Sequence, residues 1–521
     1  MTTAPTLASS RHPATAPHRP HATAPSQPRR TTLALAWVSL VFVIAASLWA
    51  GLALRRWTWE RTAPVRFQGD IRNGFNWGSR ACDAGYLNLY DDLLARKGTE
   101  GEFGLDYTPL RLGVMTAWVA WQREAFPGIT AWENDYAHTW PLLWFNTACG
   151  LAAAAGAFAL VHHVLRGRGP WQRIVLALAA ALALWFNPAV IWNAHAWPQW
   201  DLWCVPFFLW ALWYARLDRW LLAGALIAVG AMFKGQVLIV APVLLLWPLS
   251  QGRWGAVLRL VTGAALGTAV AVSPWLIRTG PAAAWLGLLT VSGGALLGLL
   301  ARAWRLPRSV HGTLRAVGFT AALWLTALVH QASFAWYHVG FAYPTRNHKG
   351  LIMGPASNLA GLLRNRYGWS PRDVVELPWT AWQPTLRTLL IACYAVPLLL
   401  CAVQAGRLER RADPRWLLAA VGPWVFMFTL MPQMHERYLL WGAACSAVWV
   451  ALGVGPTLLH LGVTALAWIM MATPMLGHDR SWAPGWFDAL DRTHPDKAWA
   501  LFVLAAALVL LTLARPPTKR V

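Results

Sequence analysis

The feature that most constrains this chain is a series of long apolar segments separated by short polar ones. Residues 31–54 form the plainest example and carry no charged side chain. A helix needs about 20 mainly apolar residues to cross a bilayer, and several segments approach or exceed that length. Charged residues make up only 13% of the chain, about half of the usual fraction in soluble proteins. We therefore expect an all-α fold, a polytopic bundle of transmembrane helices.

The basic residues indicate how the chain is threaded through the membrane. The net charge is +22, but Lys and Arg fall mainly in short segments between the apolar ones. This distribution is typical of cytoplasmic loops, so we do not expect nucleic acid as the partner that the charge would otherwise suggest. Arg29 and Arg30 precede the first span, which places the N-terminus inside the cell.

Threading the chain through these basic anchors predicts about fourteen spans with both ends inside. Two large loops then lie outside, at residues 55–139 and 335–384. The short cytoplasmic loops favour a bacterial cytoplasmic membrane, with the candidate site on its outer, periplasmic face. The predicted spans are residues 31–54, 140–164, 172–191, 200–215, 219–233, 235–249, 255–277, 283–301, 316–334, 385–405, 415–431, 438–455, 456–473 and 497–514.

The two ends of the chain differ in composition from its apolar part. Residues 1–30 contain no acid and are rich in Pro, Ala and Thr, a composition that cannot build a core. We expect them to form a disordered cytoplasmic tail. Residues 31–514 are then the transmembrane domain, and residues 515–521 are a second cytoplasmic tail.

The first predicted outer loop contains most of the candidate acids. Asp70, Asp83 and Asp106 lie there, and each could act as a general base at the membrane surface or merely form a turn or cap. Residues 79–95 are predicted to form an amphipathic helix with Asp83 and Tyr86 on one face.

Residues 109–126 of this loop are apolar enough to resemble a span. Counting them as one would invert the charge pattern of every later loop. We therefore predict a helix that lies at the membrane interface, with Trp118 and Trp121 at headgroup depth. Pro109 stands at its start, a position that suits proline.

Three later polar clusters interrupt apolar segments at predicted outer helix ends. A cation at the edge of a bundle needs a partner or an anionic ligand, unless it extends to the interface. Arg also offers bidentate geometry to phosphate. Loop hydrogen bonds, helix capping and interhelical ion pairs are the structural alternatives. The clusters are WNAHAWPQWDLW (192–203) with His195, Gln199 and Asp201, MFKGQVLIVAP (232–242) with Lys234, and MPQMHERYLLWG (431–442) with His435, Glu436 and Arg437.

Together these motifs resemble glycosyltransferase superfamily C (GT-C), the multi-span enzymes that take sugars from polyprenyl-phosphate carriers. The likeness is greatest to the dolichyl-phosphate-glucose glucosyltransferase branch and its bacterial relatives. Thr108 stands where that branch has a second Pro, and Trp200 and Asp201 stand where it has Tyr and Asn. The motifs, in the family's order, are GD-x6-W at Gly69, Asp70 and Trp77, GLDYTPL at 104–110, HAWPQWD at 195–201, FKGQVLIVAP at 233–242 and HERYLL at 435–440.

The resemblance implies an inverting hexosyl transfer from a polyprenyl-phosphate sugar to a lipid-linked or cell-envelope glycan, with no cofactor. It implies Asp70 as the catalytic base, while another bacterial GT-C pattern points to Asp83, and Asp106 would orient the loop or touch the acceptor. Lys234, His435 and Arg437 would bind the donor phosphate. The implied substrate-binding residues are Trp77, Tyr107, Arg111, His195, Gln199, Asp201 and Glu436.

Other functions remain open from the sequence. A transporter or flippase of lipid-linked sugars would also need an amphipathic cavity, and a polymerase or ligase of lipid-linked glycans would use the same carrier. No metal-site spacing is present, although the acids of the first loop could hold a divalent cation in a metal-dependent GT-C enzyme. Membrane lipids are the remaining expected partners.

Overall fold

The computed structural model describes residues 30–100, 105–276, 293, 308–329, 331–343, 350–376, 383–477, 485 and 494–514. Within these ranges the regular secondary structure is helical, apart from one isolated β-bridge between Val374 and Thr385. The predicted all-α class is therefore confirmed. The predicted tails, except Arg30, and the predicted span at 283–301, except residue 293, lie outside the described residues.

Eight helices in the described part of the chain are long and apolar enough to cross a membrane. This finding indicates a multi-pass membrane protein. The fourteen-span threading and its inside and outside assignments stay predictions. The eight helices are Leu35–Arg61 within α1 (Arg30–Arg61), α5 (Tyr136–Val164), Pro170–Ala196, α12 (Trp254–Ala271), Gly312–Val329 within α15 (Arg308–Val329), α19 (Leu386–Arg410), α22 (Val454–Leu476) and Pro495–Leu513 within α24 (His494–Leu513).

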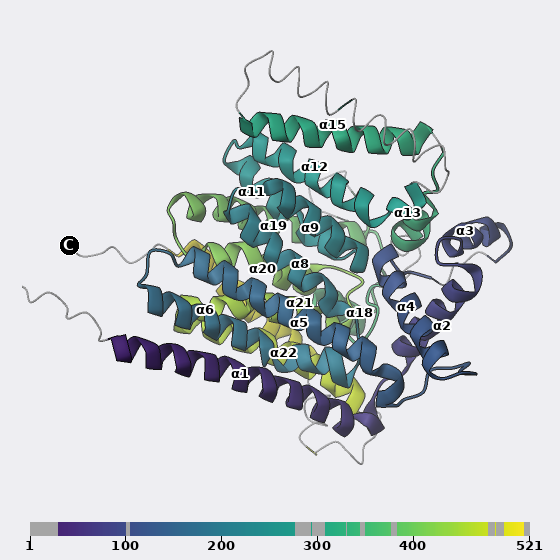
Figure 1. Ribbon diagram of the computed structural model, residues 1–521, viewed down its shortest axis with the longest axis horizontal. Helices are drawn as coiled ribbons and strands as arrows, with labels where there is room; N and C mark the ends of the chain where they lie inside the picture. The colour runs from purple at the N-terminus through teal and green to yellow at the C-terminus, as the bar shows by residue number, and fades with distance from the viewer. Residues whose placement is uncertain are drawn as a thin grey trace, which may run out of the picture. The chain divides into compact units, whose positions relative to one another are not determined.

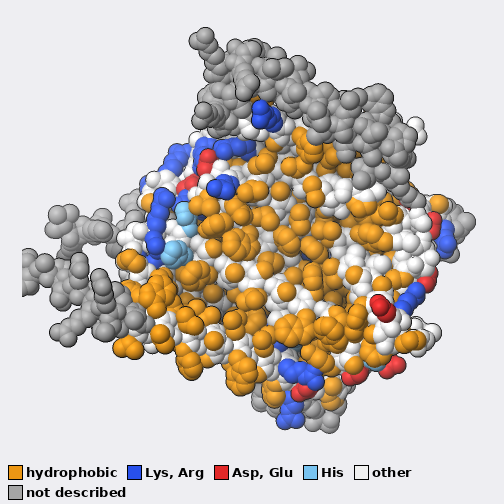
Figure 2. All heavy atoms as spheres, viewed as in Figure 1, with side chains coloured by type: hydrophobic (Ala, Val, Ile, Leu, Met, Phe, Trp, Pro, Cys, Tyr) orange, Lys and Arg blue, Asp and Glu red, His pale blue; other side chains and the backbone are white. Residues whose placement is uncertain are grey.

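Shorter apolar helices lie among these long ones (Figure 1). The chain divides into two compact units, Met1–Leu52 and Ala53–Val521, and the following description concerns the second. Figure 2 shows a broad apolar face with charged side chains gathered toward its edges, as expected of helices that contact lipid. The shorter helices are α8 (Val205–Arg216), α9 (Trp220–Phe233), α10 (Val237–Val240), α11 (Pro242–Ser250) and α20 (Trp416–Leu430).

Two helices of the first predicted loop pack closely against each other. These are α2 (Gly69–Ala84) and α4 (Pro109–Ala125). Gly78 allows the approach, because a Cβ at this position would lie 2.5 Å from the carbonyl oxygen of Met115. The interface fixes α2, and with it the first-turn residue Asp70, on the rest of the unit.

The predicted interfacial helix begins at Pro109, as expected, and spans Pro109–Ala125. Trp118, however, is buried. Its ring meets Phe75 of α2 edge-on, and its indole N–H donates to the carbonyl of His138 at 3.0 Å. Trp118 thus packs on α2 instead of contacting lipid headgroups, while the predicted depth of this helix in the membrane stays a prediction.

The predicted helix over residues 79–95 is also wrong. α2 ends at Ala84, Gly85 adopts a positive φ of 85°, and α3 (Leu89–Glu100) begins four residues later. A positive φ is ordinary for glycine and breaks the helix here. Asp83 and Tyr86 consequently do not share a helix face, and Tyr86 donates to the carbonyl of Pro109 at 2.7 Å.

Candidate active site

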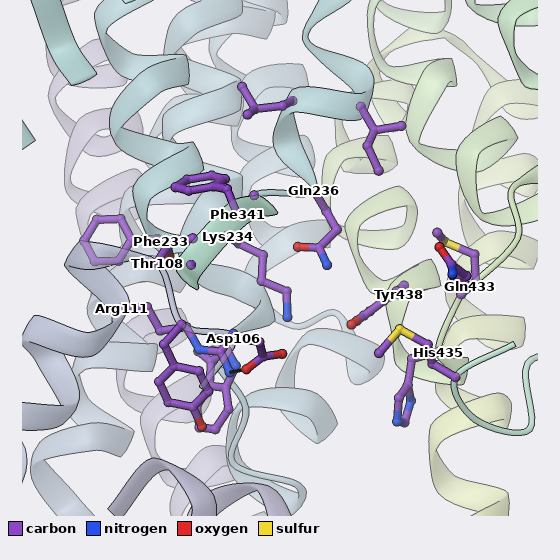
Figure 3. Close-up of a pocket in the computed structure, with 18 of the residues that line it drawn as sticks. Asp106, Thr108, Arg111, Phe233, Lys234, Gln236, Phe341, Gln433, His435 and Tyr438 are labelled. Atoms are coloured by element: carbon purple, nitrogen blue, oxygen red, sulfur yellow. Dashed lines mark ion pairs between the residues drawn. The ribbon is translucent and has the colours of Figure 1, made fainter. Parts of the chain in front are cut away.

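A cavity of about 700 Å³ lies where α2, the start of α4, the α9–α10 break and the segment after α20 meet (Figure 3). Segments far apart in the sequence supply its walls, and most of them are helix starts or helix breaks. Eight residues that the sequence singled out line the cavity. They are Asp70, Trp77, Asp106, Tyr107, Arg111, Lys234, His435 and Arg437.

Asp70 lies in the first turn of α2, where a carboxylate is favoured by the helix dipole. Its Oδ2 accepts hydrogen bonds from Gln199 Nε2 at 2.9 Å and Trp197 Nε1 at 3.2 Å, and pairs with Arg437 at 3.0 Å. These three contacts all fall on one oxygen and fix the orientation of the carboxylate. Gln199 thus contacts the acid, and does not line the cavity as a substrate-binding residue would.

Asp201 lies behind the cavity wall and is fully buried. Its Oδ1 is 2.7 Å from Lys234 Nζ, and its Oδ2 is 3.1 Å from Arg437 Nε. Asn193 also donates to Oδ2, at 3.2 Å. The predicted substrate-binding role does not fit a side chain that reaches no cavity surface, so the structure makes Asp201 an internal partner of the two cations.

Lys234 and Arg437 belong to two helix breaks. α9 ends at Phe233, and Lys234 is extended, with φ −151° and ψ 106°, before α10 begins at Val237. Arg437 stands in the short 3-10 helix Glu436–Tyr438, after the end of α20 at Leu430. Figure 3 shows Lys234 projecting into the cavity, with His435 and Tyr438 across the cavity from it.

His435 lies between an acid and an arginine. Its Nδ1 is 2.6 Å from Glu436 Oε2, and its Nε2 is 3.3 Å from an Arg437 guanidinium nitrogen. Glu436 is itself buried and does not line the cavity, so it orients His435 instead of binding substrate. Gly354 covers this pair so closely that a Cβ there would lie 2.1 Å from Glu436 Oε2.

Residues 106–111 contribute the opposite wall. The Arg111 guanidinium stacks on the rings of Tyr107, at 3.5 Å from its centroid, and Trp200, at 4.4 Å. Its NH2 lies 4.0 Å from Asp106. This arrangement holds the Arg111 guanidinium beside the cavity, and Figure 3 shows Asp106 and Arg111 on the same side of it.

Two further candidate residues, in addition to Gln199, Asp201 and Glu436, lie outside the cavity lining. The Asp83 carboxylate is 65% exposed and pairs with Arg123 at 2.6 Å. The hydrogen bond from Arg123 holds the pKa of Asp83 below its usual value. His195 is buried, and its Nε2 lies 3.2 Å from the Thr147 hydroxyl. Neither residue lines the cavity, so Asp70 is the better placed of the two candidate bases.

Four polar lining residues were not singled out from the sequence. Asn73 follows Asp70 by three positions, so helical periodicity alone could have placed it on the same face. Gln236 is two residues beyond Lys234. Arg387 and Gln433 gave no local signal, because their position depends on how α19 and the segment after α20 meet. All four lie in the lining.

The charged residues of the lining carry a positive excess. Arg111, Lys234, Arg387 and Arg437 face two carboxylates, Asp70 and Asp106, with Asp201 behind them. Two buried acids behind the wall, Asp201 and Glu436, balance the two extra positive charges of the lining before any proton on His435. The lining itself still offers cations to an anionic group, which would gain charge-assisted hydrogen bonds in a partly desolvated pocket.

Comparison with known proteins adds no assignment, since no protein-family model and no curated protein matches the chain. In the described part of the chain, no three His, Cys, Asp or Glu side chains are grouped as they would be around a metal ion. The function is therefore argued from the cavity.

Proposed function

We propose that the protein is an inverting membrane glycosyltransferase that moves a hexose from a polyprenyl-phosphate donor to a lipid-linked or cell-envelope glycan. The observation that carries this proposal is one cavity that combines an oriented carboxylate, four lining cations and an apolar flank. The GT-C motifs of the sequence line the same cavity, which is consistent with a common role. The site would face the periplasm of a bacterial cytoplasmic membrane.

The apolar flank supplies the place for a lipid. Leu238, Ile239 and Ile391 line the cavity, and Leu238 and Ile391 are 47% and 41% exposed. Because they belong to α10 and α19, the cavity opens beside helix surfaces that would lie in the hydrocarbon region. A polyprenyl chain could bury apolar area there while its phosphate remains at Lys234.

The reaction follows from this placement. An acceptor hydroxyl attacks C1 of the donor sugar, and Asp70 takes its proton as general base. The new C1–O bond forms as the bond from C1 to the phosphate oxygen breaks, and the polyprenyl phosphate leaves with the bonding electrons. Lys234, His435 and Arg437 stabilise the charge on that phosphate. A single displacement inverts the configuration at C1.

Transfer from a radiolabelled panel of polyprenyl-phosphate hexoses to native membrane lipid extract tests the proposal. We expect Asp70→Asn to lose about 10²-fold or more of the activity, the range of general-base catalysis. Asp83→Asn is the matched control, because this acid also lies on α2 but outside the cavity lining, and it should retain activity. Release of no carrier phosphate from any donor by the wild type would overturn the proposal.

A further inference from the structure

The two cations proposed to bind the donor phosphate share one buried counter-ion. Asp201 contacts Lys234 through Oδ1 at 2.7 Å and Arg437 through Oδ2 at 3.1 Å. The cations belong to breaks that are about 200 residues apart in the chain, at positions 234 and 437. A single rigid carboxylate thus determines how far apart the two positive groups stand at the cavity wall.

Asp201 is itself held from several sides. It begins the 3-10 helix Asp201–Cys204, which leads into α8. Trp441 of α21 (Leu439–Cys445) donates its indole N–H to the Asp201 carbonyl at 2.7 Å, and Asn193 donates to its side chain at 3.2 Å. With no exposed surface, the carboxylate has no room to follow a moving cation.

This support matters most for Lys234. A lysine ammonium is a point charge on a flexible stem, and ordering such a side chain costs rotamer entropy. In this structure the fold orders Lys234 before any ligand arrives. The donor phosphate would therefore meet a preorganised charge, which is the arrangement that favours tight binding.

Arg437 is divided between two acids. Its Nε faces Asp201, while NH1 faces Asp70 at 3.0 Å. Asp201 therefore fixes the guanidinium plane and directs its outer edge toward the cavity, where the acid and the leaving phosphate would meet.

We propose that Asp201 is a positioning residue that sets the spacing and direction of the Lys234 and Arg437 charges for the donor phosphate. The inference rests on the proposed function, because it takes that phosphate as the ligand. It assigns Asp201 no contact with substrate. Its effect on catalysis passes entirely through the two cations.

The test uses the full chain in lipid nanodiscs, with Asp201→Asn and Asp201→Glu. Binding of a short-chain polyprenyl phosphate is measured by ligand-induced thermal stabilisation, and the KM values for donor and acceptor are measured separately. We expect both variants to bind the polyprenyl phosphate about tenfold more weakly or worse, the loss of one charged hydrogen bond. The donor KM should rise in parallel, and the acceptor KM should stay unchanged.

Glu409→Gln is the matched control. Glu409 is a mostly buried acid that pairs with Arg216 at 2.6 Å, but it does not line the cavity. Its loss should lower thermal stability without changing the donor KM. A purely structural role for Asp201 would give the same result as this control, since a smaller folded fraction lowers the apparent kcat and leaves both KM values unchanged.

The outcomes separate the two proposals. If the wild type binds no polyprenyl phosphate, the proposed function fails. If the wild type binds it and both Asp201 variants bind it equally well, the positioning role of Asp201 is overturned. If Asp201→Asn does not fold, Asp201→Glu decides, because it keeps the charge and shifts the carboxylate by one methylene.

Discussion

Two carboxylates, one fully buried and one mostly buried, lie at opposite ends of α8, and each pairs with cations. Asp201 precedes the helix and contacts Lys234 and Arg437, both of which line the cavity. Glu409 meets Arg216, the last residue of α8, and also accepts hydrogen bonds from Trp247 at 2.6 Å and Gln251 at 2.9 Å. The chemistry of the two clusters is alike, but of the two only the first supplies cations to the cavity described above.

The comparison teaches that a buried ion pair is not in itself a sign of function. Removing one partner of such a pair is strongly destabilising wherever it occurs, because a buried charge is left alone. The Asp201 cluster, called the functional cluster below, differs because its cations pair with a buried acid and also line the cavity. Variants of the two clusters should therefore differ in which property they change, activity or stability.

Arg437→Met would break the functional cluster at its centre. The variant removes the group that contacts both Asp70 and Asp201. We expect sugar transfer to fall by about 10²–10³-fold, the usual loss when one electrostatic stabiliser of a transition state is removed. Single-turnover transfer from the donor measures this effect, and Arg216→Met serves as the control at the other end of α8. Equal losses in both variants would contradict the comparison.

Glu409→Gln would break the second cluster. Arg216 would lose its ion-pair partner in a site where both side chains are mostly buried. We expect the free energy of unfolding to fall by about 3 kcal/mol, the lower end of the range for a broken buried pair, while the transfer rate per folded molecule is kept. Thermal unfolding and activity of the same preparation are compared. A loss of specific activity would place Glu409 in the function.

Gly354→Ala would sharpen the comparison by disturbing only the edge of the cavity cluster. The added Cβ would meet Glu436 Oε2 at 2.1 Å and His435 Cε1 at 3.1 Å. We expect a loss of stability of about 1–3 kcal/mol, typical of overpacking, together with weaker donor binding because His435 turns away. Gly169→Ala, at an open position with an ordinary φ of −57°, controls for the general effect of a Gly-to-Ala change. Donor binding that is unchanged in Gly354→Ala would count against His435 as a phosphate ligand.

The Asp83–Arg123 pair offers an exposed third case and the smallest expected effect. The hydrogen bond from Arg123 lowers the pKa of Asp83 in the folded state. Its contribution to stability is therefore present above the unfolded pKa, and it is lost as the pH falls through the lowered folded pKa. We expect wild type to be slightly more stable than Asp83→Asn near pH 6, with no difference near pH 2. Thermal unfolding over this range measures it, and a large difference would mean that the pair is not the surface pair the structure shows.

Some of the site could be predicted from the sequence, because its residues interrupt apolar segments where a charge is costly. Lys234, His435 and Arg437 were singled out on this ground, and all three line the cavity. Asn73 could also have been predicted, because it follows Asp70 by three positions and therefore lies on the same face of α2. Arg387 could not have been predicted, because no motif surrounds it in the sequence at the start of an apolar helix. Its place in the site depends on how the helices pack.

Other errors came from local patterns that the fold overrides. The helical periodicity of residues 79–95 predicts one amphipathic helix, but α2 ends before Gly85, in the middle of this range. The apolar face of α4 resembles a membrane-facing surface, but it packs on α2 through Gly78 and Phe75. In each case a competing helix contact or a backbone turn determined the outcome.

The sequence by itself determined the class of this protein. Exposing such long apolar segments to water would cost much free energy, and in a bilayer a helix satisfies all of its backbone hydrogen bonds internally. A helical membrane protein therefore follows from composition and segment length alone. The tertiary structure decided which polar residues meet. Asp70 pairs with Arg437 across 367 positions, and Asp201 became an internal counter-ion instead of a ligand of substrate. Such pairings depend on the distances between helix ends after packing, and no periodicity within one segment records them.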